Sequence, residues 1–295
     1  GPVSGVIVHE DGAIVGYTPS ALLSNASDID ALDQLTAIIP ASLPAGISET
    51  TSSGGYTIVY DPTAYYNIRL VPLPPAHSLA IDPSNAVFQS LAEGEEMQVA
   101  VDYGVSDGLV TTAASAVFTV IGSNDAPVVS APIAVALSED AAPVTIDALA
   151  NAHDIDHGAV LSVTNAPPPV PAADSTQDGI EAPLAPPPAP APAGGPFDVS
   201  TLPAGVTFDA ATNSFTLDPT DAAYQSLSAG QSRTVTVNYG VTDGYTTTAA
   251  VATFTVTGVN DAPVVSGSGA MAVHEDGIKT GFTPTELLAH ASDID

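Results

Sequence analysis

The chain has 295 residues, a length that allows two or three domains of ordinary size. It carries 33 Asp and Glu against 3 Lys and Arg, a formal net charge of −30 that argues against nucleic acid and anionic membranes as partners and favours cations. The absence of Cys excludes disulfides, thiolate metal sites and cysteine catalysis, and no apolar run approaches the ~20 residues of a membrane span.

The first predicted elements are short strands separated by turns and loops. Apolar runs broken by Pro and Gly over residues 35–58 are typical of strands and turns. Residues 60–75, with two adjacent tyrosines and prolines at 72, 74 and 75, predict a surface excursion. In the second half of the chain, the Pro/Ala-rich tract 166–196 lacks apolar periodicity and predicts an extended, polyproline-like loop.

A long hairpin is predicted near the end of each of two repeats. Apolar residues alternate from Met97 to Val105, which indicates a strand with one buried face. The Ser-Asp-Gly turn at 106–108 and the apolar segment 116–120 predict the returning strand. The same pattern recurs at 235–244 and 254–256, so the two copies are predicted to be paralogous domains.

A joint between repeats is marked by the peptide Asn-Asp-Ala-Pro-Val-Val-Ser, which occurs at residues 124–130 and again, without change, at 260–266. Residues 266–295 repeat the pattern of residues 1–30, so we expect the chain to be a window from a longer array. The predicted divisions are a repeat at 1–122, a repeat at 123–258, and a linker with the opening of a third repeat at 259–295.

Acidic residues recur at the same phase of each repeat, as Glu-Asp, Asp-Ile-Asp, Asp-Gly and Asn-Asp. Calcium takes six to eight oxygen ligands at ~2.3–2.6 Å, and Asp-x-Asp in extended backbone aims two carboxylates to one side. Asp-Gly and Asn-Asp are also common turn formers, but turns do not require all four patterns together. The candidate calcium ligands are Glu10, Asp28, Asp30, Asp107, Asn124, Asp125, Glu139, Asp154, Asp156, Asp243, Asn260, Asp261, Glu275, Asp293 and Asp295.

These segments resemble a known family. Ser-Glu-Asp-Ala-Ala-Pro-Val at 138–144, followed by Ala-His-Asp-Ile-Asp-His-Gly at 152–158, resembles the opening of a cadherin repeat. Tyr-Gly-Val-Thr-Asp-Gly at 239–244, with Gly-Val-Asn-Asp-Ala-Pro at 258–263, is similar to the cadherin-like and VCBS repeats of bacterial secreted adhesins of the repeats-in-toxin (RTX) class. The resemblance covers both repeats apart from residues 60–77 and 166–196.

The resemblance implies an all-β chain of tandem Ig-like or cadherin-like β-sandwich domains, joined end to end with Ca2+ at the joints. For the first joint it implies as ligands Glu10, Asn124, Asp125, Asp154, Asp156 and Asp243. For the second joint it implies Glu139, Asn260, Asp261, Asp293 and Asp295. Asp28, Asp30 and Asp107 occupy the equivalent positions in the first repeat, so the resemblance implies that they belong to an upstream joint. Ala126 stands in place of an Asn, which implies fewer ions per joint than in animal cadherins.

The function implied is that of non-enzymatic, calcium-rigidified extender repeats of a large bacterial surface or secreted adhesin, acting extracellularly in cell adhesion or biofilm formation. Calcium ions and neighbouring repeats of the same chain are the expected partners. Two alternatives stay open. One is a module that binds carbohydrate or protein through Tyr65 and Tyr66 or through residues 166–196. The other is a filament subunit whose residues 266–295 complete the sheet of a neighbouring molecule, a form of self-assembly.

Histidine chemistry is the remaining alternative. His153 and His157 flank an Asp-Ile-Asp segment and suggest zinc, yet His-Glu-Asp-Gly at His9 and His274 lacks the second His of a helical His-Glu-x-x-His motif. No nucleophile elbow and no phosphate-binding loop with a following Lys are present. An enzyme is therefore the least favoured class.

Overall fold

The structure is a computed structural model that describes residues 1–29, 34–60, 68–167, 195–267, 269–272, 275–276 and 281–295. Unit 1 comprises residues 1–125 and 155–159, and unit 2 comprises 126–154 and 160–295. Both units are built from β-sheets, so the expectation of an all-β chain with successive β-sandwiches is confirmed. No helix in the described part of the chain is long and apolar enough to cross a membrane.

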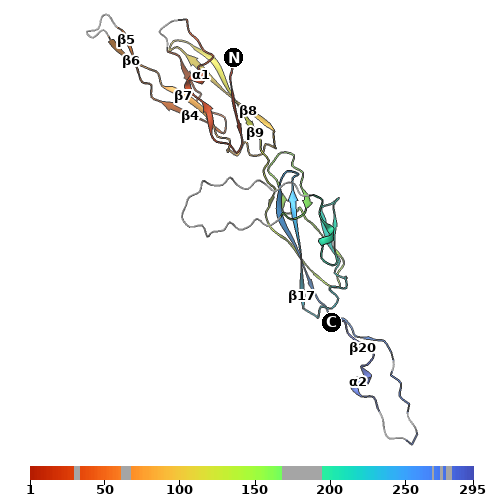
Figure 1. Cartoon of the computed structure of the whole chain (residues 1–295). Helices are drawn as coiled ribbons and strands as arrows, with labels where there is room; N and C mark the ends of the chain where they lie inside the picture. The colour runs from red at the N-terminus through yellow and green to blue at the C-terminus, as the bar shows by residue number, and fades with distance from the viewer. Residues whose placement is uncertain (30–33, 61–67, 168–194, 268, 273–274, 277–280) are drawn as a thin grey trace, which may run out of the picture. The chain divides into compact units, whose positions relative to one another are not determined.

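Unit 1 packs a four-stranded sheet against a three-stranded one (Figure 1). The four-stranded sheet has the order β1-β9-β8-β3, with β1 Val3–His9, β9 Thr111–Ile121, β8 Glu96–Ser106 and β3 Thr36–Ile38. The three-stranded sheet has the order β2-β7-β4, with β2 Val15–Tyr17, β7 Ala76–Ile81 and β4 Ile47–Ser52, and α1 spans Pro19–Leu22. Strand β1 runs parallel to β9, and the other pairs in these sheets are antiparallel.

The core of unit 1 follows from the alternation in β8 and β9. Val99, Val101 and Tyr103 are buried at every second position, as period two requires. Phe118 of β9 is fully buried, and its ring meets the edge of the Tyr17 ring with centroids 4.9 Å apart. Because Tyr17 belongs to the opposite sheet, this contact joins the two layers.

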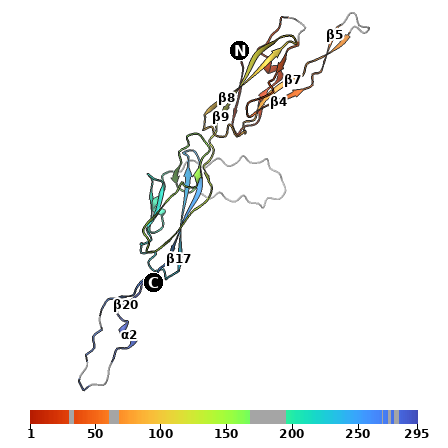
Figure 2. The ribbon, with the colours of Figure 1, turned by 180° about the vertical axis from the view of Figure 1, so that it is seen from behind.

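The predicted surface excursion overlaps a pair of strands. Strand β5 (Tyr56–Tyr60) pairs antiparallel with β6 (Ile68–Pro72), and Figure 2 shows this pair beyond the ends of β4 and β7. β-Branched and aromatic residues favour strands here, and the proline falls at a strand end, where a missing N–H is tolerated. Residues 61–67, which include Tyr65 and Tyr66, lie outside the described residues.

Unit 2 repeats the same plan. Its four-stranded sheet has the order β11-β18-β17-β14, with β11 Ile133–Ser138, β18 Thr247–Thr257, β17 Ser232–Thr242 and β14 Ser162–Thr164. Its three-stranded sheet has the order β12-β16-β15, with β12 Val144–Asp147, β16 Ser214–Leu217 and β15 Val206–Asp209. The short elements are β10 Val128–Val129, β13 Ala152–His153, η1 Val199–Thr201, β19 Val264–Val265, α2 Pro284–Leu287 and β20 Ala291–Ser292. Residues 168–194, most of the Pro/Ala-rich tract, are outside the described part.

A buried tyrosine ties the hairpin of each unit to the opposite wall of its sandwich. In unit 2 the Tyr239 hydroxyl donates to the Ala148 carbonyl at 2.8 Å, and burial raises the pKa of Tyr239 to about 12. In unit 1 the Tyr103 hydroxyl donates to the Leu22 carbonyl at 2.5 Å. The repeated contact shows that the two units share side-chain packing as well as strand order.

Replacing Tyr239→Phe is expected to lower the free energy of unfolding by about 1–2 kcal/mol, because it leaves the buried Ala148 carbonyl without its donor. Urea denaturation followed by circular dichroism measures the change. Tyr245→Phe is the matched control, since Tyr245 is 61% exposed and should tolerate the same change. Equal effects of the two substitutions would contradict the assignment.

Candidate calcium site

Glu10 immediately follows β1 and is almost completely buried, with 1% of its surface exposed. Its backbone N–H donates to the Ile121 carbonyl at 3.0 Å, so the parallel pairing of β1 with β9 fixes its position. Its side-chain Oε1 accepts the Ser123 N–H at 2.8 Å. The carboxylate is therefore held against the segment that leads from β9 into the joint peptide.

A glycine allows that segment to pass close to the preceding loop. A Cβ built on Gly122 would lie 2.3 Å from the Ala92 carbonyl oxygen, a distance that side-chain atoms do not occupy. The Gly122 N–H donates to the Glu95 carbonyl at 2.8 Å. In unit 2, Gly258 has the same role, because its Cβ would lie 2.2 Å from the Leu227 carbonyl oxygen. The backbone that aims Ser123 at Glu10 thus depends on a residue without a side chain.

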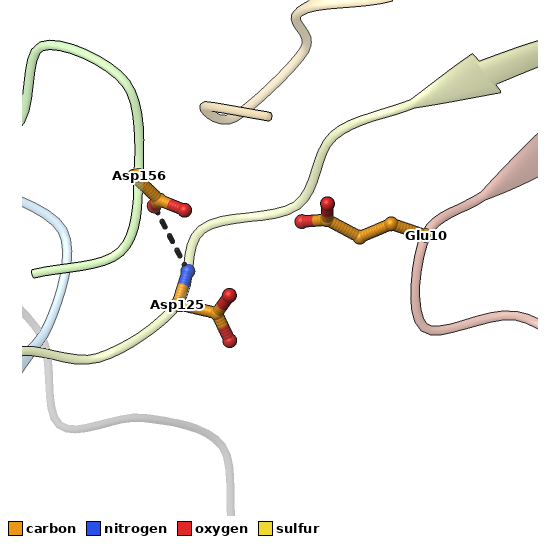
Figure 3. A group of neighbouring side chains, drawn as sticks. All are labelled: Glu10, Asp125 and Asp156. Atoms are coloured by element: carbon orange, nitrogen blue, oxygen red, sulfur yellow. Dashed lines mark hydrogen bonds between the residues drawn. The ribbon is translucent and has the colours of Figure 1, made fainter. Parts of the chain in front are cut away.

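Asp125 and Asp156 complete the site around Glu10 (Figure 3). Carboxylate oxygens of the three residues all lie within 4.8 Å of one another. The Asp125 N–H donates to Asp156 Oδ2 at 3.0 Å. The segment that carries Asp156 is anchored in unit 1 by the His157 N–H, which donates to the Ser90 carbonyl at 2.9 Å. Three segments far apart in sequence therefore supply one cluster of carboxylates.

The electrostatics of the cluster are unfavourable without a cation. Glu10 Oε2 is buried and has no hydrogen-bond partner among the described residues. Burial raises the pKa of Glu10, the neighbouring charge of Asp125 raises it further, and the hydrogen bond from Ser123 acts in the opposite direction. A buried carboxylate with one oxygen left without a hydrogen bond and no positive charge beside it destabilises the fold unless it is neutralised.

Unit 2 contains a second cluster with the same construction. Glu139 is 1% exposed, its N–H donates to the Thr257 carbonyl at 3.0 Å, and its Oε1 accepts the Val259 N–H at 2.7 Å. Oxygens of Glu139, Asp261 and Asp295 all lie within 4.8 Å of one another. The Asp261 N–H donates to Asp295 Oδ2 at 2.8 Å.

The second cluster also shares the charge imbalance of the first. Glu139 Oε2 is buried and lacks a hydrogen-bond partner within the described part of the chain. Loss of solvent raises the pKa of Asp261, and the nearby charge of Asp295 raises it further. Turn formation alone does not account for a buried Glu in each copy.

The asparagines of the two joint peptides shape the backbone beside the clusters. The Asn124 side-chain amide donates to the Asp125 carbonyl at 2.6 Å, and Asn260 makes the same contact with Asp261 at 2.6 Å. Such local side-chain bonds are typical of Asn in turns. The repeated Asn-Asp pair thus sets the conformation that points each Asp N–H at the third carboxylate.

No protein-family model matches this sequence, and no curated protein matches it. Solved structures of similar fold include the extracellular cadherin domains 1–5 of protocadherin gamma B2, at 12% identity and a TM-score of 0.38, covering 90% of this chain and 41% of that chain. The EC1-2 segment of human protocadherin-24 matches at 14% identity and a TM-score of 0.37, covering 88% of this chain and 95% of that chain. An endo-fucoidan hydrolase of glycoside hydrolase family 107 matches at 13% identity and a TM-score of 0.26, covering 88% of this chain and 28% of that chain.

The chain is thus similar in fold to cadherin extracellular domains, and it spans about two fifths of the first of these structures. All three TM-scores lie below 0.5, and likenesses of this degree carry no argument about what the chain does. The functional argument rests on the geometry of the two clusters.

The predicted hairpin residues Asp107 and Asp243 belong to neither cluster. Asp107 Oδ1 accepts the backbone N–H groups of the residues two and three positions on, both at 2.7 Å, and these bonds lower the pKa of Asp107. Asp243 Oδ1 makes the same pair of contacts, also at 2.7 Å. Both carboxylates close the turn of a long hairpin, which is the role that Asp-Gly has in many turns.

Four further predicted ligands are described outside the clusters, and one is not described. Asp154 is partly buried and belongs to unit 2, whereas Asp28, Glu275 and Asp293 are exposed. Asp293 borders the second cluster, because its Oδ1 accepts the Asp295 N–H at 3.4 Å. Asp30 lies outside the described residues.

Two glutamates near the first cluster were not predicted from the sequence. Glu93 Oε2 accepts the Asn124 N–H at 2.9 Å, and Glu95 Oε2 lies 3.3 Å from His157 Nδ1. The sequence feature that could have identified them is a difference between the repeats. Residues 92–95 are Ala-Glu-Gly-Glu, whereas the equivalent residues 228–231 are Ser-Ala-Gly-Gln. Within the described part of the chain, neither His153 nor His157 belongs to a group of three or more possible metal ligands.

Substitutions at Asp243 test directly whether this residue stabilises the turn or binds calcium. Asp243→Ala removes the two backbone hydrogen bonds and the one from the Thr246 hydroxyl, and it is expected to cost about 1 kcal/mol of stability. Asp243→Asn keeps the oxygen that accepts the two backbone bonds and should cost less. Thermal denaturation compares the two variants. Calcium titration should give wild-type affinity for Asp243→Asn, and a marked loss there would make Asp243 a ligand instead.

Proposed function

We propose that the chain is a set of calcium-binding structural repeats, with one ion at the Glu10 cluster and one at the Glu139 cluster. The observation that carries the proposal is the buried glutamate of each cluster, whose Oε2 has no hydrogen-bond partner in the described structure. In each cluster the carboxylate oxygens lie within 4.8 Å of one another, close enough to share one ion at ~2.4 Å from each ligand.

Calcium fits these clusters better than the other common cations. Each cluster offers carboxylate oxygens from three separate segments and no nitrogen or sulfur. Oxygen-only sets suit Ca2+ and Mg2+, whereas Zn2+ prefers sites that include nitrogen or sulfur. Mg2+ requires near-octahedral ligands at ~2.0–2.1 Å, and Ca2+ accepts irregular sites completed by backbone carbonyls or water.

The proposed role of the ion is mechanical. Asp125 lies in the joint peptide, Glu10 precedes it by a whole sandwich, and Asp156 follows it in the chain. Like charges at these positions repel one another, and a shared cation converts them into ligands of one centre. Calcium would thereby fix the conformation of the joint peptide, which is what an extended array of repeats needs to resist bending.

The biological setting belongs to the same proposal. A chain of −30 net charge without Cys, built from tandem sandwiches, suits the extender region of a large bacterial adhesin, either secreted or held at the cell surface. Extracellular calcium modules bind at dissociation constants of ~0.1–1 mM, so such sites are loaded outside the cell. Cell adhesion or biofilm formation is the activity that an extender of this kind would serve.

Isothermal titration calorimetry of the whole chain with CaCl2 tests ion binding. We expect Glu10→Gln and Glu139→Gln each to remove one site and the double variant to remove both, because the substitution replaces a charged ligand by a neutral one. Glu96→Gln, at the exposed start of β8, is the matched control and should keep both sites. Calcium binding by the double variant equal to that of the wild type would refute the proposal.

Small-angle X-ray scattering tests the mechanical role separately. Calcium should narrow the distribution of maximum dimensions of the wild-type chain and leave that of the double variant unchanged. If calcium binds calorimetrically without narrowing the distribution, the clusters hold calcium but do not stiffen the chain.

A further inference from the structure

Strands β5 and β6 continue the β4–β7 pair of unit 1 past the end of its core (Figure 2). Ser52 pairs with Ala76 at the end of β4 and β7, and the pairing resumes with Tyr56 opposite Pro72. Among the described residues, none in β5 or β6 belongs to the core cluster of unit 1. The two strands therefore form a two-stranded sheet without a second layer.

The equivalent strands of unit 2 show that the sandwich closes without this extension. The Asp82 N–H donates to the Gly46 carbonyl at 2.8 Å, and the Asp218 N–H donates to the Gly205 carbonyl at 2.8 Å. This shared contact makes β15 and β16 the counterparts of β4 and β7. Residues 210–213 form a turn that joins β15 directly to β16. The β5–β6 pair is therefore an addition to the fold, and it calls for a role of its own.

One face of the β5–β6 pair is apolar and exposed. Ile58 lies opposite Leu70 and Tyr56 opposite Pro72, and residues directly opposite each other share a face of the sheet. Tyr56 is 68% exposed, Ile58 66% and Leu70 59%. Because a two-stranded sheet alone is only marginally stable in water, this pair gains stability from further strands.

The hydrogen bonds of the ladder leave one set of backbone groups on β5 for such a strand. The Leu73 N–H donates to the Gly55 carbonyl at 2.9 Å. Bonded and unbonded pairs alternate along an antiparallel ladder, so Thr57 bonds to β6, whereas Tyr56 and Ile58 direct their N–H and C=O groups to the outer edge. Within the described part of the chain, no strand occupies that edge.

The two outer edges differ in how well they are protected from pairing. Pro72 falls at an outward position of β6, where its missing N–H removes a donor from that edge, and Arg69 places a charged residue on the same strand. Proline and charge are the features that prevent pairing at sheet edges. Strand β5, with the sequence Tyr-Thr-Ile-Val-Tyr, contains neither. The edge open to another strand is therefore that of β5.

Charge favours a second copy of this chain as the partner at that edge. Two copies repel each other, because each has a formal net charge of −30. Neither β5 nor β6 contains Asp or Glu, and β6 contains one of the chain's 3 Lys and Arg. Contact through these strands brings two acidic chains together without placing carboxylates opposite one another.

The sequence of β5 also suits pairing with itself. A two-fold interface uses the same patch on both copies, so the patch must be complementary to itself. Tyr-Thr-Ile-Val-Tyr reads in both directions as an aromatic residue, three β-branched residues and an aromatic residue. Antiparallel pairing centred on Ile58 places Ile58 opposite itself and Tyr56 opposite Tyr60 of the second copy. Aromatic and β-branched cross-strand pairs of this kind stabilise sheets.

We propose that two copies of this chain associate by antiparallel pairing of their β5 strands about a two-fold axis at Ile58, which gives a four-stranded sheet in the order β6-β5-β5-β6. This is recognition by strand addition, in which backbone hydrogen bonds hold the two strands together. Five residues on each side bury less than the ~1,200 Å² of a stable interface, so the association is weak and reversible. It involves neither calcium cluster and does not depend on the function proposed above.

Sedimentation equilibrium of the whole chain over a range of concentrations measures the association, in about 150 mM salt to limit repulsion between copies. The wild type should form dimers reversibly, in calcium and in chelator alike. Ile58→Lys should weaken dimerisation about tenfold or more, because it places two like charges opposite each other. Ile14→Lys is the matched control, since Ile14 lies in the loop between β1 and β2 and is 63% exposed, against 66% for Ile58. A wild type that stays monomeric at every concentration, or equal dimerisation of the two variants, would overturn the proposal.

Cross-linking tests the register of the pairing. The chain has no Cys, so a single introduced thiol reports which residues meet. In the proposed pairing the Cα atoms of residue 58 in the two copies lie about 5.5 Å apart, within the range of a disulfide. Residue 57 meets its own copy diagonally at ~7–8 Å, beyond that range. Under mild oxidation with diamide, Ile58→Cys should therefore form covalent dimers about tenfold faster than Thr57→Cys. Equal rates for the two variants would reject pairing centred on Ile58.

Discussion

Saturating calcium is expected to raise the free energy of unfolding of each unit by about 2.7 kcal/mol when the free ion exceeds the dissociation constant a hundredfold, because only the folded clusters bring three carboxylates together. Differential scanning calorimetry in calcium and in chelator, at matched ionic strength, measures the effect. An equal concentration of Mg2+ is the control for general screening and should stabilise much less. Identical unfolding temperatures in calcium and chelator would contradict the expectation.

The Glu10→Gln variant gives this prediction a sharper form. In chelator the wild type holds a buried carboxylate with a raised pKa and an oxygen without a partner, so neutral Gln should raise the stability of unit 1 at pH 7. In calcium the same substitution removes a ligand, so the variant should be less stable than the wild type. The sign of the effect is therefore expected to reverse between the two conditions.

A reversal of sign separates ligation from packing. A glutamate that merely filled space would give an effect of one sign in both conditions. Glu96→Gln makes the same charge change at an exposed position and should shift neither curve. Glu139→Gln should reproduce the reversal in unit 2, since Glu139 has the same burial and the same kind of hydrogen bonds as Glu10.

The strands and hairpins of this chain were predictable because their signals are local. Alternation from Met97 to Val105 predicted a strand with one buried face, and β8 shows that pattern of burial. The turn at Ser-Asp-Gly was predicted as well, and β8 and β9 pair in register from Ser106 opposite Thr111. Strand β6, the partner of β5, was interpreted only as part of a surface excursion, because nearby prolines obscured a short β-branched run.

The site was predictable only in part, because burial depends on pairings between distant segments. By itself the Glu-Asp pair at 10–11 gives no sign of which acid faces inward, and the choice of Glu10 as a ligand came from the family resemblance. Parallel pairing of β1 with β9 decides this, and it buries Glu10. The same limit applies to Asp107 and Asp243, which were predicted as ligands because they recur. Each one closes a hairpin turn, and neither belongs to a cluster.

The two clusters proposed to bind calcium are expected to differ in affinity, with the Glu10 cluster binding the ion about twentyfold more tightly at low salt. Glu93 and Glu95 lie next to this cluster through their contacts with Asn124 and His157, whereas the second repeat has Ala229 and Gln231 at these positions. A divalent ion gains about 1 kcal/mol from a carboxylate ~8 Å away in water, which is about fivefold in affinity for each carboxylate.

Calorimetry on single-site proteins measures the two affinities separately. Glu139→Gln leaves only the first cluster, and Glu10→Gln leaves only the second. Adding Glu93→Ala and Glu95→Gln to the Glu139→Gln variant should weaken calcium binding at its remaining Glu10 cluster about twentyfold. Adding Ala229→Glu and Gln231→Glu to the Glu10→Gln variant should strengthen calcium binding at its remaining Glu139 cluster by a similar factor. Equal affinities of the two unmodified sites would reject the prediction.

Salt dependence decides whether charge or loop geometry is responsible for that difference. The glutamates also accept hydrogen bonds, Glu93 from the Asn124 N–H and Glu95 from the Ala92 N–H, so their loss also loosens the loop beside the joint. At 150 mM salt the Debye length is ~8 Å, and the electrostatic gain falls to about twofold for each carboxylate. A difference that shrinks with salt therefore has an electrostatic origin. A difference that persists at high salt would instead come from the hydrogen bonds that hold the joint peptide in place.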